Sequence, residues 1–305
     1  MRLIGSIVTA LGLLSAATPG ATAAPRLDDK PRIAVMSAFE PEWLVLLKVL
    51  QDPQEHVVNG RRFVTGSLAG KDVVLFLSGV SMVNAAMTTQ QAIDYFDITT
   101  IVFSGIAGGV DPKLSIGDVV VSGQWGQYLE AIFARETQKG TFAIPPFLDT
   151  QFPNFGMIHP NESEVVREGS TEPEDRFWFP VDGKLLETAR QVAGSVTLEK
   201  CAGADKCLSH QPKVVVGGNG VSGSAFVDNA AFREFTFQTF EAQVLDMESA
   251  ATAHVAYSNG VPFIAFRSLS DLAGGGEAEN EMGVFFALAS ANSAKIVQAF
   301  LAALP

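Results

Sequence analysis

The sequence has little positive charge for its size. Its 305 residues contain 21 lysines and arginines against 33 acids, which gives a formal net charge of −12 at pH 7. A chain this acidic does not attract nucleic acid through long-range electrostatic fields. We therefore expect no nucleic-acid partner and look for a small, locally recognised ligand.

Several short motifs of common enzyme classes are also missing. The four histidines (His56, His159, His210 and His254) show no metal-ligand spacing, so we expect no metal. No G-x-S-x-G elbow is present, which disfavours a Ser-His-Asp hydrolase of that type. The glycines of residues 105–109 have neither the dinucleotide-binding spacing nor the phosphate-loop lysine.

Cysteine is nearly absent, and whether the two cysteines form a disulfide depends on the compartment of the protein. Arg2, an apolar run and the small residues 21–23 predict a signal peptide over 1–23, which makes the protein periplasmic or secreted. The five-residue gap between Cys201 and Cys207 does not match the close pairs of zinc sites. Export favours a disulfide, with two free surface thiols as the alternative. No later apolar run is expected to be long enough to span a membrane.

Short buried strands alternate with helices along the rest of the chain, which predicts an α/β fold with a largely parallel sheet. Ser81 is expected to cap the helix over 82–95. Residues 130–180 are rich in proline and aromatics and predict an insertion of loops and short strands within the same domain. We expect strands at 32–38, 72–77, 99–103, 118–121, 213–216 and 261–269, and helices at 39–50, 82–95, 181–198, 229–240, 247–258 and 282–304.

Glycine-rich turns are expected after three of these strands, at 78–79, 105–109 and 217–223. Ligands of open α/β sheets collect outside the carboxyl ends of strands, and glycine lets the backbone approach them closely. The acids that fall near such ends are Glu42, Asp246, Glu248 and Asp271. Asp271 alone is explained equally well by a loop cap, and Glu248 by a helix-dipole contact. Together, carboxylates in different environments supply the acid and the base that cleavage of a sugar–base bond requires.

These motifs, taken in order, resemble the 5′-methylthioadenosine/S-adenosylhomocysteine nucleosidases of the purine and uridine phosphorylase superfamily. The resemblance is carried by residues 35–42, 78–85, 105–109 with 117–120, 222–226, 247–248 and 267–271. It implies a single three-layer α/β domain over 24–305, with a central mixed, mostly parallel sheet flanked by helices. It also implies a homodimer that hydrolyses the N-glycosidic bond of an adenine nucleoside without a cofactor.

The resemblance assigns roles residue by residue. Glu42 would activate the attacking water, and Asp271 would protonate adenine N7. Phe226 and Val227 would hold the base, and Met247 and Glu248 would hold the ribose. The remaining substrate-binding positions that it implies are Ser78, Gly79, Ala107, Gly108, Arg267 and Ser270.

Three features depart from the intracellular members of that family. Phe39 and Pro41 stand where those members usually have Met and Glu, and Asp246 replaces a Glu. The 130–180 insertion and the two-cysteine segment resemble an exported, plant-type branch that includes bark storage proteins. Two alternatives stay open beside the nucleosidase: a phosphate-dependent nucleoside phosphorylase, and a non-catalytic storage or nucleoside-binding protein.

Overall fold

The computed structural model describes residues 26–203, 206–276 and 279–305, so the expected signal peptide at 1–23 lies outside the described residues. Six helices and eighteen strands follow one another in these ranges. The helices are α1 (Glu40–Leu47), α2 (Met82–Tyr95), α3 (Gly183–Ala193), α4 (Ala230–Phe240), α5 (Ser249–Ser258) and α6 (Met282–Ala303). The strands are β1 (Asp28–Ser37), β2 (Gln51–Val58), β3 (Arg61–Leu68), β4 (Lys71–Leu77), β5 (Phe96–Gly109), β6 (Val119–Val121), β7 (Gln124–Gln127), β8 (Ala131–Phe133), β9 (Arg135–Gln138), β10 (Thr141–Ala143), β11 (Ile158–Pro160), β12 (Ser163–Val165), β13 (Glu174–Arg176), β14 (Trp178–Pro180), β15 (Val214–Val216), β16 (Asn219–Ser222), β17 (Ala242–Asp246) and β18 (Phe263–Asp271).

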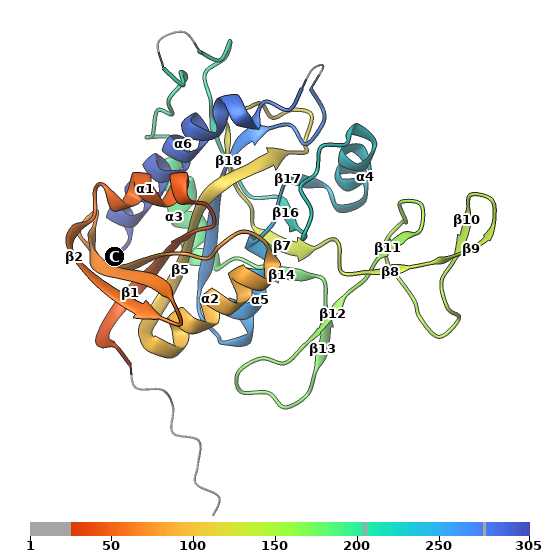
Figure 1. The fold of residues 1–305 in the computed structure, drawn as a ribbon, viewed down its shortest axis with the longest axis horizontal. Helices are drawn as coiled ribbons and strands as arrows, with labels where there is room; N and C mark the ends of the chain where they lie inside the picture. Colours follow the sequence, from red (N-terminus) through yellow and green to blue (C-terminus); the bar gives the residue numbers. More distant parts are fainter. Residues whose placement is uncertain (1–25, 204–205, 277–278) are drawn as a thin grey trace, which may run out of the picture.

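A twelve-stranded mixed sheet forms the centre of the molecule, as the α/β prediction requires (Figure 1). Its main path runs β14-β7-β16-β17-β5-β1-β4-β3-β2, and β18 pairs with both β5 and β6. The pairs β1–β4, β1–β5 and β18–β5 are parallel, so these strands end at the same edge. Strand β17 meets the last residues of β5 in the antiparallel sense. Strand β5 therefore links the parallel strands β4, β1 and β18 to a second group of strands.

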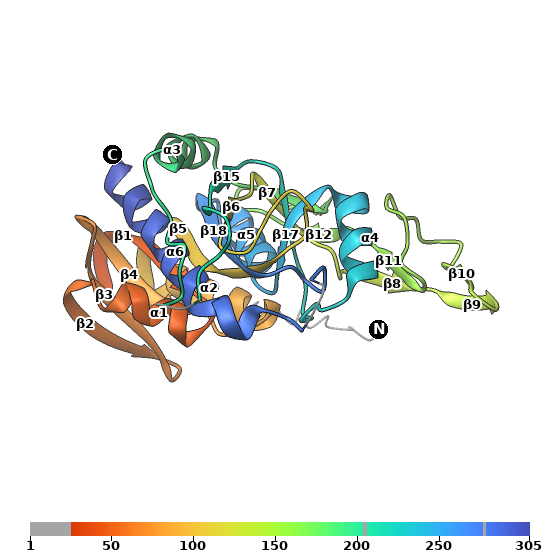
Figure 2. The same ribbon diagram turned by 90° about the horizontal axis from the view of Figure 1, so that it is seen from above.

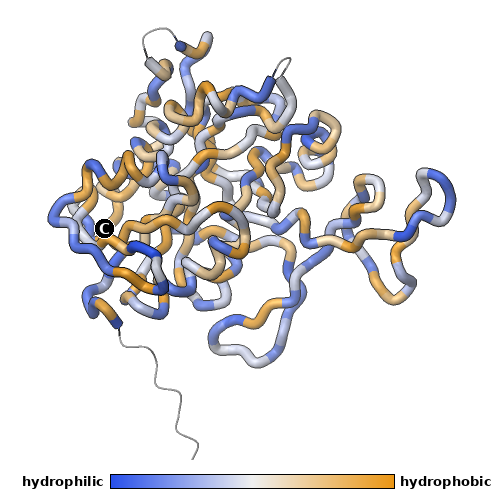
Figure 3. Tube along the Cα trace, viewed as in Figure 1, coloured by the Kyte–Doolittle hydropathy of each residue, from blue (hydrophilic) through white to orange (hydrophobic). Residues whose placement is uncertain are grey.

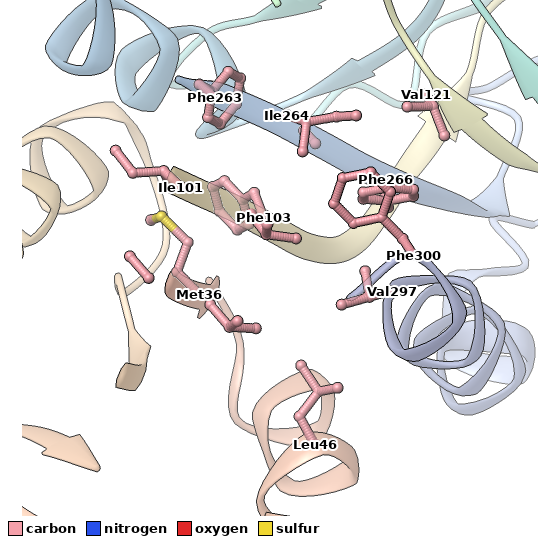
Figure 4. Packing of buried hydrophobic residues seen from close by; sticks show 14 of the residues in the cluster. Met36, Leu46, Ile101, Phe103, Val121, Phe263, Ile264, Phe266, Val297 and Phe300 are labelled. Carbon is pink, nitrogen blue, oxygen red and sulfur yellow. The ribbon is translucent and has the colours of Figure 1, made fainter. Parts of the chain in front are cut away.

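Helices flank the sheet in two groups, α2 beside α5 and α6 beside α1 and α3 (Figures 1 and 2). Figure 4 shows side chains of β5, β18 and α6 meeting in the core between them. The rings of Phe266 and Phe300 lie 4.9 Å apart there. In Figure 3 hydrophobic residues concentrate along the central strands and α6. The continuous apolar runs of the sequence are thus accounted for by burial on both faces of the sheet.

Helix α6 corrects one expectation from the sequence. It is long and apolar enough to cross a membrane by length and composition, although no such run was expected after the leader. About half of it (56% of its most apolar window) is buried against the protein. Its closest neighbours are β18, β5 and α1. The helix therefore packs in this structure as a core helix.

Residues 130–180 leave the body of the molecule as an arm of short strands and loops (Figure 1). The antiparallel pair β8–β11 and the hairpin β9–β10 project from the sheet, and β14 returns to pair with β7. Aromatic residues fasten the base of the arm to α4: the rings of Phe177 and Phe240 stack at 5.2 Å. The prediction of loops and short strands is confirmed.

Several details differ from the sequence predictions. Ser81 precedes α2, but its side chain makes no cap hydrogen bond to the helix. Residues 105–109 stay in strand β5 because β18 and β17 pair with them, so they are not a turn. Part of the expected turn at 217–223 is strand β16, which pairs with β7 and β17. Strands β2, β3 and β17 were not predicted. Strand β2 is a polar, exposed edge strand without an apolar run, whereas β3 and β17 have buried residues that the sequence analysis did not assign to strands.

The two cysteines form a disulfide, Cys201–Cys207, which confirms that prediction. Both lie in the exposed segment between α3 and β15. The bond joins two residues that are six positions apart in the sequence. Its effect on the protein is therefore local.

Candidate active site

A cavity of about 200 Å³ lies where the ends of β1, β5, β17 and β18 converge. Leu245 of β17 and Asp271 of β18 both pair with Gly108, so the two halves of the sheet meet at this residue. The segment after β1 and the loop before α4 supply the other walls. The fold thereby brings four stretches that are far apart in sequence to one place.

Glu42 is held by the start of helix α1. It occupies the third position of the helix, and its Oε2 accepts the backbone N–H groups of Ala38 and Phe39, both at 3.0 Å. Its Oε1 accepts the N–H of Ile106 from β5 at 2.8 Å. Burial raises the pKa of Glu42, while the charge of Arg267 and the three backbone donors lower it. Glu42 is thus a fixed carboxylate whose affinity for a proton is increased by burial.

Arg267 is fully buried beneath the cavity among three carboxylates, those of Glu42, Asp246 and Glu248. Its Nε–H donates to Ser249 Oγ at 2.9 Å, and Asp246 Oδ2 lies 2.7 Å from the same nitrogen as an ion-pair partner. Its Nη2 is 3.5 Å from Glu248 Oε2, a weaker contact. One guanidinium does not neutralise three carboxylates, and the pKa values of Glu42 and Glu248 are raised, first of all by burial.

Glu248 is the group in this cluster whose proton affinity is raised most clearly. Burial raises its pKa to about 7, with Arg267 lowering it and the charges of Asp246 and Glu42 raising it. Its Oε1 accepts the backbone N–H of Ser81 at 2.8 Å. Asp246 forms a short hydrogen bond with the Ser222 hydroxyl and accepts the N–H of Glu248 at 3.1 Å, which fixes the backbone at the head of α5.

Asp271 lines the same cavity and is the last residue of β18. Its Oδ1 accepts the N–H of Ala273 at 2.8 Å, and its Oδ2 accepts the hydroxyl of Ser270 at 2.9 Å. Burial raises its pKa, the hydrogen bonds from Ala273, Ser270 and Asn280 lower it, and the charge of Asp228 raises it. Asp271 has no arginine partner among the described residues, which sets it apart from Glu42 and Glu248.

The rest of the cavity wall is apolar. Phe226 stands at the cavity and is 59% exposed, so its ring is available to a flat ligand. The apolar lining residues are Ala38, Phe39, Val80, Ile106, Ala107, Ala225, Phe226, Val227, Leu245, Met247 and Met282.

Nine of the twelve residues that the sequence predicted for the site line this cavity: Glu42, Ala107, Gly108, Phe226, Val227, Met247, Glu248, Ser270 and Asp271. The other three, Ser78, Gly79 and Arg267, lie outside the lining. Ser78 is fully buried, and its hydroxyl donates to Gly79 O at 2.9 Å. Arg267 acts from beneath, through the carboxylates.

Two features of the site were not found from the sequence. Met282, the first residue of α6, lines the cavity, and Asn280 contacts Asp271. Both come after the glycines of residues 274–276 in the sequence, and nothing in the pattern of that stretch indicates that either residue lies near the strand ends. The place of Phe39 in the wall is marked in the sequence only by its unusual residue type.

The family model of the phosphorylase superfamily matches residues 32–302. Bark storage protein A of Populus deltoides is 30% identical, with 81% of this chain and 79% of that protein covered. A 5′-methylthioadenosine/S-adenosylhomocysteine nucleosidase of Halalkalibacterium halodurans is 28% identical, with 88% and 97% covered.

Solved structures give the same fold. The corresponding nucleosidase of Neisseria meningitidis, in complex with methylthio-immucillin-A, superposes with a TM-score of 0.66 at 26% identity. That comparison covers 90% of this chain and 99% of the other. A nucleosidase of Colwellia psychrerythraea in complex with adenine gives a TM-score of 0.67 at 25% identity, with 92% and 97% covered.

Proposed function

The chain belongs to the phosphorylase superfamily, and from that membership we propose that it hydrolyses the N-glycosidic bond of an adenine nucleoside and releases the free base. 5′-Methylthioadenosine, S-adenosylhomocysteine and adenosine are the substrates to test. The observation that carries the proposal is the meeting of Glu42, Glu248 and Asp271 at one cavity, each with its pKa raised by burial.

The different surroundings of the carboxylates assign the roles. Burial raises the pKa of Glu42, but the Arg267 charge and the three backbone donors favour its ionised form, so we assign it as the base that takes a proton from water. Burial raises the pKa of Asp271, and the like charge of Asp228 acts in the same direction, so we assign it as the donor to N7 of the leaving adenine. The bond to the sugar breaks as the base accepts this proton, and water adds to the oxocarbenium-like carbon.

The other walls bind the substrate. Phe226 stacks on the adenine face, with Val227 beside it. Met247 and Glu248 hold the ribose. Oε1 of Glu248 accepts the N–H of Ser81, and Oε2, whose contact with Arg267 is weak at 3.5 Å, accepts a sugar hydroxyl. Phe39, Val80 and Met282 give the remaining space an apolar character.

Phosphorolysis is the alternative reaction on this fold, and it needs a cation placed for phosphate. No Arg or Lys lines the cavity within the described ranges. Arg61 is engaged with Ser78 O at 3.0 Å and Asn84 Oδ1 at 2.9 Å. Arg62 pairs with Glu55, and Arg135 is exposed on the arm. Water is therefore the expected nucleophile.

The deciding experiment incubates the protein with the three nucleosides, with and without phosphate, and identifies the sugar product. Free ribose or 5′-substituted ribose at equal rates in both conditions supports hydrolysis. A sugar 1-phosphate that forms only with phosphate would make the protein a phosphorylase. Tight binding of a nucleoside without any base release would support the binding or storage alternative, which the similarity to bark storage protein A favours.

We further propose that the protein is a homodimer. Several apolar side chains near the cavity are exposed: Val80, Val83, Met87 and Phe226. Val83 and Met87 lie one turn apart on α2, and a patch of this kind marks an interaction surface. Light scattering of the Val83→Glu variant tests this, with Val57→Glu on the edge strand β2 as the matched exposed control. A monomeric mass for the wild-type protein at micromolar concentration would contradict the proposal.

Export to the periplasm or the medium is also a proposal. The leader pattern of residues 1–23 and the Cys201–Cys207 disulfide support it. Cell fractionation followed by intact-mass measurement tests both features at once. A mature chain that begins near Ala24 is expected, and a cytoplasmic full-length chain would contradict it.

A further inference from the structure

The side-chain amide of Asn280 joins three segments of the cavity wall. Its Nδ2 donates to Asp228 Oδ1 at 3.1 Å and to Asp271 Oδ1 at 3.4 Å. Its Oδ1 accepts the backbone N–H of Met282 at 2.9 Å. Asp228 directly follows the cavity residue Val227, and Met282 itself lines the cavity. One side chain thus connects the general acid, the base-holding segment and the start of α6.

The amide is chemically suited to this place. Asp228 and Asp271 are two carboxylates that approach each other from different segments, and two like charges repel unless a donor lies between them. An asparagine amide offers two N–H donors and one acceptor oxygen, so it satisfies both acids and a backbone N–H at once. An aspartate of the same shape would offer a third negative charge instead.

We propose that Asn280 is a positioning residue for the reaction, holding the Asp271 carboxyl toward the base and keeping it apart from the charge of Asp228. This inference rests on the proposed function, in which Asp271 is the general acid. Its geometric part depends only on the contacts of the amide. Asn280 acts through Asp271 and does not itself touch the reacting atoms.

The charges around Asp271 come from several elements. Asp228 lies just before α4, Arg233 lies within α4, and Glu281 precedes α6. Glu42, Asp246 and Glu248 line the same cavity, and Arg267 is buried behind them. Among them the charge of Asp228 raises the pKa of Asp271, and the hydrogen bond from Asn280 lowers it. The two neighbours therefore act on the acid in opposite directions.

The test uses substitutions that change charge but hardly change shape. Asn280→Asp removes the donor and adds a carboxylate, which raises the pKa of Asp271. Because the general acid must be protonated, the alkaline limb of the kcat–pH profile then moves to higher pH. Asp228→Asn removes the like charge and lowers the pKa of Asp271, so the limb moves to lower pH. Asn280→Ala lowers kcat by roughly threefold to tenfold, the range of one lost hydrogen bond. Asn154→Ala is the control, because that exposed amide donates only to Gly156 O on the arm.

A purely structural role for Asn280 would lower kcat and leave the limb in place, which would overturn the proposal. Titration of the Asp271 carboxyl carbon by NMR, in protein labelled with ¹³C at the aspartate side chain, keeps the test independent of turnover. The signal is assigned by its loss in Asp271→Asn. If the wild-type protein releases no base, the proposed function fails, but opposite shifts of this titration in Asn280→Asp and Asp228→Asn still support the positioning role. Unchanged titration in both variants refutes it.

Discussion

The backbone N–H of Ser81 donates a hydrogen bond of 2.8 Å to Oε1 of Glu248, a residue 167 positions further along the chain. Ser81 makes this contact with φ of 81° and ψ of 161°, a region that residues with a Cβ rarely occupy. Its hydroxyl bonds to Ser224 Oγ at 3.0 Å, which ties the loop before α2 to the loop that carries Phe226. The strain is thus located where a carboxylate of the cavity is oriented.

This relationship predicts that Ser81→Gly is more stable than Ser81→Ala. Both variants lose the hydroxyl, but only glycine relieves the backbone strain, which costs of order 1–3 kcal/mol. Glycine also makes the unfolded chain more flexible than alanine does, which lowers the stability of the Ser81→Gly variant by about 0.4–1 kcal/mol. We expect a net difference of about 1 kcal/mol in urea unfolding, with base release retained in Ser81→Gly. Equal stability of the two variants would mean that the conformation is not strained.

Glu248 predicts a pH-dependent stability. Burial raises its pKa to about 7 in the folded protein, against an ordinary value of 4.5. The folded state therefore binds the proton more tightly, so its stabilisation is complete below pH ~4.5 and is lost as the pH rises through about 7. The shift corresponds to about 3 kcal/mol.

The measurement is urea unfolding of the wild-type protein and of Glu248→Gln between pH 4.5 and 8. Subtracting the two curves removes the pH dependence of all other groups to a first approximation. The wild-type protein should lose about 3 kcal/mol relative to Glu248→Gln across this range. A difference that stays constant with pH would show that Glu248 titrates normally.

Gly105 packs so closely against Glu42 and Arg267 that we expect a side chain at this position to be destabilising. A Cβ at this position would lie 3.0 Å from Glu42 Oε1 and 3.2 Å from Cζ of Arg267, with Nη1 of Arg267 closer still. Arg267 is fully buried, and its guanidinium is held by Ser249 Oγ, Asp246 and the backbone oxygen of Ile106. Gly105→Ala should therefore lower the free energy of unfolding by about 1–3 kcal/mol, as overpacking does. It should also lower kcat more than it raises KM, because Glu42 is displaced.

Gly183→Ala is the matched control for this substitution. Nothing lies within 4 Å of a Cβ at Gly183, which begins helix α3. The control should keep wild-type activity and at least wild-type stability. Normal activity of Gly105→Ala would show that the strand moves to accept the methyl group.

Helix α2 and the positions of Glu42 and Asp271 were predictable from the sequence, because each depends on residues that are close to it in the chain. Helix α2 has the predicted bounds, because a strand end with Ser78-Gly79 and a long helical pattern are both encoded nearby. Glu42 and Asp271 were placed by the helix start and the strand end beside them. The strand character of residues 105–109 was missed, because it comes from pairing with β18 and β17 and not from glycine itself.

The remainder depends on tertiary contacts that no local pattern carries. A buried arginine in an apolar strand gives no sign of the three carboxylates that surround it. Ser81 was expected to cap its own helix, but its hydroxyl bonds to Ser224 across the site. Helix α6 packs against β18, and the start of α6 thereby places Met282 at the cavity and Asn280 beside Asp271.

The disulfide predicts a small, local effect. Cys201 and Cys207 are six positions apart, so the loop-entropy gain is roughly 2 kcal/mol. The Cys201→Ser/Cys207→Ser double variant should unfold more easily by up to about that amount and keep full activity, because neither residue lines the cavity. Intact mass before and after reduction, with an increase of two hydrogens, checks that the bond forms. A large loss of kcat on reduction would contradict the prediction that the disulfide has only a local effect.

The last prediction separates the acid from the base. Adenine is a poor leaving group as an anion, so proton donation by Asp271 should contribute about 10²–10⁴-fold to kcat. Asp271→Asn keeps the shape and loses the proton, so kcat should fall by at least ~10², with little change in the Kd of the nucleoside. Glu42→Gln should also abolish turnover, because the attacking water is no longer activated. A p-nitrophenyl riboside, whose leaving group needs no proton, should restore much of the activity of Asp271→Asn and none of that of Glu42→Gln. Equal recovery of both variants, or near-normal activity of Asp271→Asn on adenosine, would show that a different group donates the proton.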